Sequence, residues 1–147
     1  MSSTNAADPA PEFVDTNVFV YSYDQSAGRK RDLALRLLER LWVARTGCLS
    51  LQILQEFYVS ATGRLRPALT PSEAASETSA LAQWRLHEPG PSDLLSAIDL
   101  HQRLRISFWD AMVLQSALQM GCKVLWTEDL NNGQSYAGVT ARNPFAT

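Results

Sequence analysis

Short apolar segments alternate with longer amphipathic segments along most of this chain. Residues 13–14, 48–49 and 123–126 are short, mostly apolar runs of strand length, and residues 27–45 carry leucines at the spacing of one helical face. Short apolar strands separated by helices are typical of a parallel sheet that is covered on both faces. We therefore expect an α/β fold with a short, mostly parallel central sheet of about 4–5 strands flanked by helices.

Local signals place the ends of several helices. Four helices are expected to follow residues that can cap their first turn, which are Ser50, Thr70, Ser92 and Ser107. The signal at Thr70 is the most complete, because Pro71 follows it and Glu73 completes a capping box.

Length and composition fit one compact domain. The 147 residues are 46% hydrophobic and 19% charged. A chain of this size buries enough surface to be stabilised by a single core, without disulfide bonds or a structural metal ion. Residues 1–11 are rich in Ser, Ala, Pro and Asn and show no periodicity. We expect a disordered leader over residues 1–11 and one domain over residues 12–147.

Charge and cysteine content exclude several classes of protein. Thirteen Lys and Arg against fifteen Asp and Glu give a net charge of −2, which argues against a protein that binds nucleic acid over most of its surface. Cys48 and Cys122 lack the spacing of a zinc or redox motif, so we expect buried, reduced thiols. No segment approaches the roughly 18 apolar residues that span a bilayer, and the expectation is a soluble, cytoplasmic protein.

Four carboxylates occupy unusual positions. Asp15 and Asp129 each follow an apolar strand and should lie at the carboxyl edge of the sheet, whereas Glu56 and Asp110 lie among apolar residues of helices. Each has an ordinary alternative role: a helix cap for Asp15 and Asp110, an exposed helix position for Glu56, and a turn for Asp129. For Asp110 we also expect the helix dipole to lower the pKa.

If these four acids converge, their mutual repulsion requires a cation. An all-oxygen donor set without His or Cys favours a hard divalent ion, Mg²⁺ or Mn²⁺, over zinc or copper. Such ions commonly serve phosphodiester chemistry. Convergence of the four side chains is the hypothesis that the sequence poses.

The segments VDTNVFVY, LQEFYV, FWDAMVLQSA and LWTEDLNNGQ occur in this order from residue 14 onward. Together they resemble the PIN-domain nucleases, and most of all the VapC-type ribonuclease toxins of toxin–antitoxin pairs. The resemblance implies a single PIN-like domain and a Mg²⁺- or Mn²⁺-dependent endoribonuclease that inhibits growth or translation when it is free of antitoxin. The residues that match the catalytic and metal-binding acids of the family are Asp15, Glu56, Asp110 and Asp129.

Further roles follow from the same resemblance. Thr16, Asn17 and Thr127 match supporting positions of the family motifs, and the role of Glu128 is left open. The resemblance also implies a homodimer and a separate antitoxin protein that occupies the active-site groove. Arg64 and Arg66 follow the helix that carries Glu56, so we expect them to contact RNA phosphates.

Two alternatives remain open at this stage. One is a catalytically silent PIN-fold module that binds RNA or protein, although retention of all four acids argues against it. The other is a Mg²⁺-dependent phosphotransferase or phosphatase of a different α/β class, which would use an Asp nucleophile after the first strand. The D-x-D pattern of one such class is absent, because Asn17 stands where the second acid belongs.

Overall fold

The computed structural model describes residues 9–146, which form six helices and six strands. In chain order the elements are β1 (Glu12–Val14), α1 (Thr16–Tyr23), α2 (Arg29–Ala44), β2 (Gly47–Ser50), α3 (Leu51–Gly63), α4 (Pro71–Leu81), β3 (Arg85–His87), α5 (Pro91–Leu104), α6 (Phe108–Gln119), β4 (Val124–Trp126), β5 (Ser135–Tyr136) and β6 (Val139–Arg142). The first strand begins at Glu12, where the domain was expected to start. Residues 1–8 of the expected leader lie outside the described residues.

The strands form one mixed sheet in the order β3-β2-β1-β4-β6-β5. Every neighbouring pair is parallel except β5 and β6, which pair antiparallel. The α/β class and the mostly parallel sheet are therefore confirmed, with six strands where about 4–5 were expected. The strands that the sequence did not reveal are β3, a three-residue edge strand with two polar residues, and the two-residue β5.

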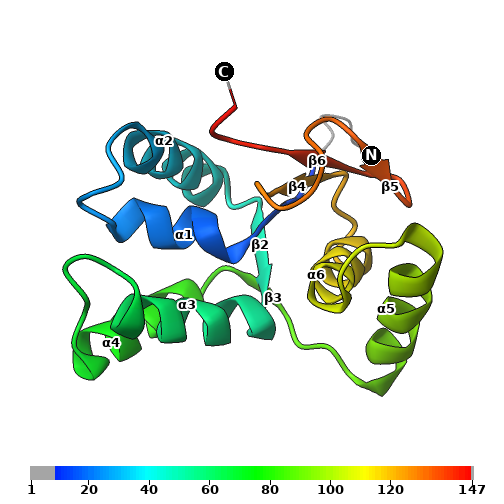
Figure 1. Ribbon diagram of the computed structural model, residues 1–147, viewed down its shortest axis with the longest axis horizontal. Coiled ribbons are helices and arrows are strands. Elements are labelled where there is room, and N and C mark those ends of the chain that lie inside the picture. The colour runs from blue at the N-terminus through cyan, green and yellow to red at the C-terminus, as the bar shows by residue number, and fades with distance from the viewer. Residues whose placement is uncertain (1–8, 147) are drawn as a thin grey trace, which may run out of the picture.

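Helices cover the sheet from two sides. Figure 1 shows α1 to α4 on one side of β1 and β2, and α5 with α6 on the other. The central strand β1 is covered so completely that Phe13 and Val14 are fully buried, and Leu49 of β2 and Leu125 of β4 are buried beside it. Burial on both faces explains why these strands are continuously apolar rather than alternating.

The helix caps agree with the sequence in part. Ser107 accepts a hydrogen bond from the backbone N–H of Asp110, and Thr70 forms the complete capping box with Glu73. The expected cap at Ser92 is wrong: the cap is Gly90, two residues earlier, α5 begins at Pro91, and the carboxylate of Asp93 accepts the Gly90 N–H. Ser50 occupies its cap position, but its buried hydroxyl has no hydrogen-bond partner among residues 9–146.

Several side-chain expectations can be compared with the fold. Cys48 and Cys122 are buried free thiols, as expected. His87 and His101 are half-buried and bond to Ser116 Oγ and to the carbonyl of Ile106. None of the helices formed by residues 9–146 is long and apolar enough to cross a membrane.

The topology brings the ends of three parallel strands together. The backbone N–H of Asp15, directly after β1, donates to the carbonyl of Trp126 at the end of β4, 2.9 Å away. The N–H of Thr127 donates in turn to Arg142 at the end of β6, also at 2.9 Å. Residues that follow β1 and β4 therefore lie side by side at the carboxyl edge of the sheet, where α/β proteins bind their ligands.

Candidate metal-dependent active site

Asp15 is the most deeply buried acid of the candidate site, with 7% of its surface exposed. Its Oδ1 accepts the backbone N–H of Thr16 at 2.8 Å and so caps α1. Its Oδ2 accepts the hydroxyl of Thr127 at 2.8 Å, which ties the end of β1 to the end of β4. The helix-cap role is thus real, and it fixes the carboxylate at the carboxyl edge of the sheet.

Glu56 reaches the same region from α3. Its Oε1 accepts the hydroxyl of Thr16 at 2.6 Å, and its Oε2 accepts the side-chain amide of Gln52 at 3.3 Å. The residue is half-buried rather than exposed. Thr16 therefore links the first two acids, with its N–H on Asp15 and its hydroxyl on Glu56.

These groups line a cavity of about 460 Å³. Its walls are formed by Asp15, Thr16, Asn17, Gln55, Glu56, Val59, Ser60, Arg64 and Asp129. The first motif, the helical glutamate and the acid after β4 therefore share one cavity, although 114 positions separate the first and last of them.

Asp110 lies near this cavity but is not part of its lining. It stands in the first turn of α6, and burial together with the charges of Asp129 and Glu56 raises its pKa, while the Ser107 hydrogen bond works in the opposite direction. The expectation that the helix dipole lowers this pKa is therefore wrong in the protein without a cation. The charges of Glu56 and Asp129 nevertheless place Asp110 within electrostatic reach of the other acids.

Asp129 contributes differently from the first two acids. Its backbone N–H donates to Thr127 Oγ1 at 3.1 Å, which leaves the exposed carboxylate on the cavity wall. Within the described part of the chain, the Asp129 carboxylate accepts no side-chain hydrogen bond.

The electrostatics of Asp15 reflect this crowding. The pKa of Asp15 is raised from 3.8 to about 7, mainly by burial and also by the charges of Asp129 and Glu56, against the hydrogen bonds from Thr127 and Thr16. A carboxylate that is buried among like charges is stabilised in its ionised form by a cation.

The donor chemistry fits a divalent ion. Asp15, Glu56 and Asp129 offer only oxygen donors, which hard ions such as Mg²⁺ and Mn²⁺ prefer. Within residues 9–146, no three Asp, Glu, His or Cys side chains lie close enough together to form a complete set of metal ligands. The residues that fit such an ion are therefore gathered around one cavity rather than packed against one another.

Arg64 is the basic residue on the cavity wall. One of its terminal nitrogens donates to Ser60 Oγ at 2.8 Å. Arg66, the other arginine expected to contact RNA, is not part of the lining and bonds instead to the backbone carbonyls of Gly63 and Leu65.

The sequence analysis missed several residues of the wall. Gln55, Val59 and Ser60 all belong to α3 and line the cavity beside Glu56. For Ser60 the sequence does contain a signal. Residues 52, 56, 60 and 64 are polar or charged at intervals of four and therefore share the helical face of Glu56. That face carries the bonds from Gln52 to Glu56 and from Arg64 to Ser60.

A mostly parallel α/β sheet with an acid-lined cavity at its carboxyl edge defines a class of ligand-binding and catalytic proteins. Within that class the chain belongs to the PIN domain family, whose defining sequence pattern matches residues 13–134. Among curated protein sequences none matches this chain.

Solved structures share the fold at low sequence identity. A toxin–antitoxin complex from Klebsiella pneumoniae has a TM-score of 0.67 at 20% identity, over 92% of this chain and 99% of that one. VapC20 of Mycobacterium tuberculosis, a toxin that cleaves the sarcin–ricin loop, has a TM-score of 0.61 at 19% identity, over 80% of this chain and 88% of its own. FitAcB from Neisseria gonorrhoeae has a TM-score of 0.60 at 14% identity, over 92% of this chain and 99% of that one.

Proposed function

We propose that this protein is a metal-dependent endoribonuclease and the toxin of a toxin–antitoxin pair. The observation that carries the proposal is the single cavity at the carboxyl edge of the sheet, which Asp15, Glu56 and Asp129 line together with Arg64. Membership of the PIN family and the likeness to VapC20, an RNA-cleaving toxin, support the same reaction class.

The acids would hold the metal. In this proposal Asp15, Glu56, Asp110 and Asp129 bind Mg²⁺ or Mn²⁺, whose oxygen preference matches the donor set. When bound, such an ion makes water a better nucleophile and stabilises the charge that builds up on the phosphodiester.

The remaining residues of the site orient the acids or bind the RNA. Thr127 holds the Asp15 carboxylate through its hydroxyl, and Thr16 holds Glu56 in the same way. Asn17 adds a neutral amide to the wall beside them. Arg64 keeps guanidinium donors for a phosphate of the RNA, which its planar group can bind with two parallel hydrogen bonds.

The first test is cleavage of RNA by protein freed of antitoxin and metal. Labelled structured RNA is incubated with Mg²⁺ or Mn²⁺ and with the wild type, Asp15→Asn and Asp110→Asn. We expect cleavage that needs both the metal and the acids. Binding of RNA without cleavage, unchanged by the metal, would instead favour the silent RNA-binding module.

The antitoxin has a candidate docking groove beside the cavity. A groove of about 640 Å³ lies between α3 and α4, with an almost wholly apolar lining that includes Leu54 and Tyr58. Gln55 and Val59 line both this groove and the acidic cavity. We therefore propose an antitoxin segment that lays an apolar helical face in the groove and places a basic side chain against the acids.

Co-purification with the candidate antitoxin tests this docking mode. Val59→Glu puts a charge into the apolar groove and should abolish the complex, whereas Val43→Glu, at an exposed position on α2, should leave it intact. An antitoxin that is retained by Val59→Glu would contradict the proposal.

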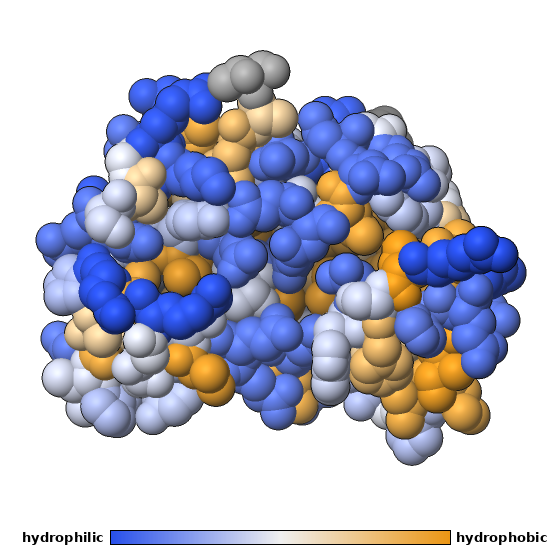
Figure 2. Space-filling model, in the orientation of Figure 1, coloured by the Kyte–Doolittle hydropathy of each residue, from blue (hydrophilic) through white to orange (hydrophobic). Residues whose placement is uncertain are grey.

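A homodimer is proposed through a different surface. Figure 2 shows apolar residues at the surface over α5 and α6, and exposed side chains there include Leu94, Leu95 and Trp109. Exposed apolar surface of this kind commonly marks a protein interface, and Leu94 and Leu95 on α5 are the candidate contacts. Leu95→Glu should convert the dimer to monomer in light scattering, and a wild type that is already monomeric at high concentration would refute the dimer.

A further inference from the structure

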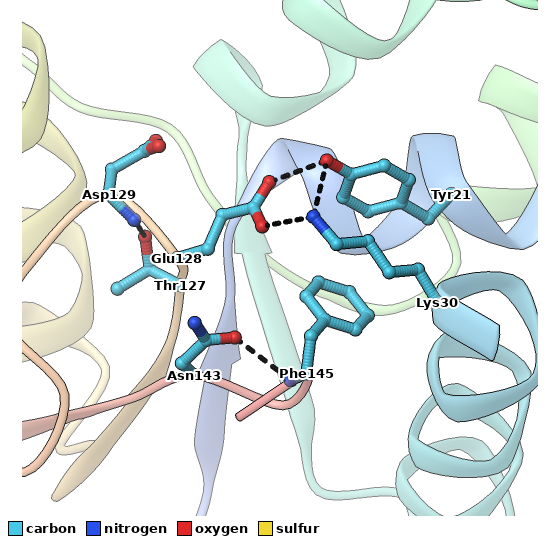
Figure 3. A network of polar contacts seen from close by, with 7 residues as sticks. All are labelled: Tyr21, Lys30, Thr127, Glu128, Asp129, Asn143 and Phe145. Carbon is cyan, nitrogen blue, oxygen red and sulfur yellow. Dashed lines mark hydrogen bonds and ion pairs between the residues drawn. The ribbon is translucent and has the colours of Figure 1, made fainter. Parts of the chain in front are cut away.

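Glu128 lies between two residues of the site, and its own side chain turns away from the cavity. Both of its neighbours contribute to the site. The Thr127 hydroxyl holds the Asp15 carboxylate, and Asp129 lines the cavity. Figure 3 shows the Glu128 side chain directed toward Tyr21 and Lys30, whereas the Asp129 carboxyl group points elsewhere.

Both carboxylate oxygens of Glu128 are occupied. Oε1 accepts the hydroxyl of Tyr21 at 2.7 Å, and Oε2 accepts the ammonium of Lys30 at 3.0 Å. Lys30 also donates to the Tyr21 hydroxyl at 3.2 Å, so the three groups close a triangle (Figure 3). The triangle joins α1, α2 and the segment after β4.

Two aromatic rings lie beside the Lys30 ammonium. The Lys30 nitrogen stands 4.7 Å from the centre of the Tyr21 ring and 5.4 Å from that of Phe145. The two rings pack edge to face at 5.0 Å. The Glu128 side chain is 20% exposed, so its charge depends on Lys30 more than a fully solvated charge would.

We infer that Tyr21, Lys30 and Glu128 form a clamp that holds residues 127–129 in place for the site. In this arrangement Glu128 is a positioning residue that acts through Thr127 and Asp129, and it is not a metal ligand. The inference rests on the proposed function for its catalytic consequence, and it makes a structural claim that can be tested separately. It also gives a role to Lys30, a residue of α2 that does not line the cavity.

A second ion pair of α2 supplies a matched control. Arg40 bonds Glu12 at 3.1 Å, and the two side chains are 53% and 19% exposed, close to the 45% and 20% of Lys30 and Glu128. Glu128 lies in the segment after β4, whereas Glu12 lies at the start of β1, away from the carboxyl edge of the sheet. Lys30→Met and Arg40→Met each remove one charge while keeping an apolar stem.

Amide hydrogen exchange tests the clamp without reference to activity. We expect exchange at residues 127–129 to become about tenfold faster in Lys30→Met and to stay unchanged in Arg40→Met. Equal exchange at these residues in the wild type and Lys30→Met would overturn the inference.

Manganese binding and RNA cleavage then separate a positioning residue from a ligand. Lys30→Met and Glu128→Gln should both weaken Mn²⁺ binding by about tenfold and lower kcat, with little change in KM for RNA, and Arg40→Met should do neither. Loss of Mn²⁺ binding in Glu128→Gln alone would identify Glu128 as a ligand and refute the clamp. A wild type that neither binds Mn²⁺ nor cleaves RNA would defeat the proposed function, and the exchange experiment would still decide the clamp.

Discussion

The candidate site has two halves that are built differently. Asp15 and Glu56 are held by hydrogen bonds from the hydroxyls of Thr127 and Thr16, and Asp15 is buried. Asp110 receives only a local bond from Ser107, at the start of its own helix, and the Asp129 carboxylate receives none within the described residues and is exposed. The first half is fixed by the fold, whereas the second is free to adjust when a cation or a substrate arrives.

This contrast suggests a division of labour. In the proposed function, the fixed pair of carboxylates would set the position of the cation, because little conformational entropy is lost when an ion binds to fixed ligands. The free pair can complete the ligand set afterwards. Substitutions in each half test whether the halves differ as much in function as they do in construction.

The largest expected effect is on cleavage. Asp15→Asn should lower kcat/KM for RNA on the order of a thousandfold, because it removes a fixed ligand. Asp129→Asn should cost only about tenfold, since its carboxylate is exposed and unrestrained. Both values come from cleavage assays at saturating Mn²⁺, and equal losses in the two variants would remove the distinction between the halves.

The next effect concerns stability and pH in the metal-free protein. Because the pKa of Asp15 is raised from 3.8 to about 7, the folded protein binds a proton that the unfolded chain has already released between these values. Stability therefore falls as pH rises through this window. Asp15→Asn should be more stable than the wild type above pH 7, on the order of 4 kcal/mol, and no more stable at pH 4.

Thermal unfolding at the two pH values measures this difference, and Mn²⁺ should reduce it by stabilising the wild type. The raised pKa of Asp110 predicts the same sign for Asp110→Asn, with a smaller change because the residue is only half-buried. A wild type that is as stable as Asp15→Asn at every pH would contradict the burial argument.

A smaller effect should follow from loss of the hydroxyl that holds Asp15. Thr127→Val should weaken Mn²⁺ binding by about 10–100-fold, because hydrogen bonds to ligands orient them. Thr78→Val is the matched control, since the Thr78 hydroxyl bonds only to the carbonyl of Ala74 in its own helix. Calorimetric titration would show whether the two variants differ.

The smallest effect is expected at Arg64, the basic residue of the cavity wall. Arg64→Ala should raise KM for RNA by a few fold and reduce the slope of log affinity against log salt by about one. Arg66→Ala should change neither as much, because Arg66 lies outside the cavity lining. A larger change in the salt dependence of RNA binding for Arg66→Ala than for Arg64→Ala would contradict this prediction and identify Arg66 as the phosphate contact.

Local sequence signals were enough for much of the fold and the site. Apolar runs and caps located most elements, and the position of Asp15 after such a run placed it at the sheet edge. The strand β3 was missed because an edge strand is covered less fully and needs no continuous apolar run. The early start of α5 was missed because Asp93 and Gly90, rather than Ser92, satisfy its first turn.

The sequence by itself determined which acids stand at strand ends and which polar residues share the face of α3. Only the tertiary structure decided their partners. Thr127 meets Asp15 across 112 positions, and Lys30 meets Glu128 across 98. Spacing along the chain carries no information about such bonds, because they depend on how β4, α1 and α2 pack against the sheet. For the same reason the role of Glu128 could not be read from its neighbours, although the identity of the motif around it could.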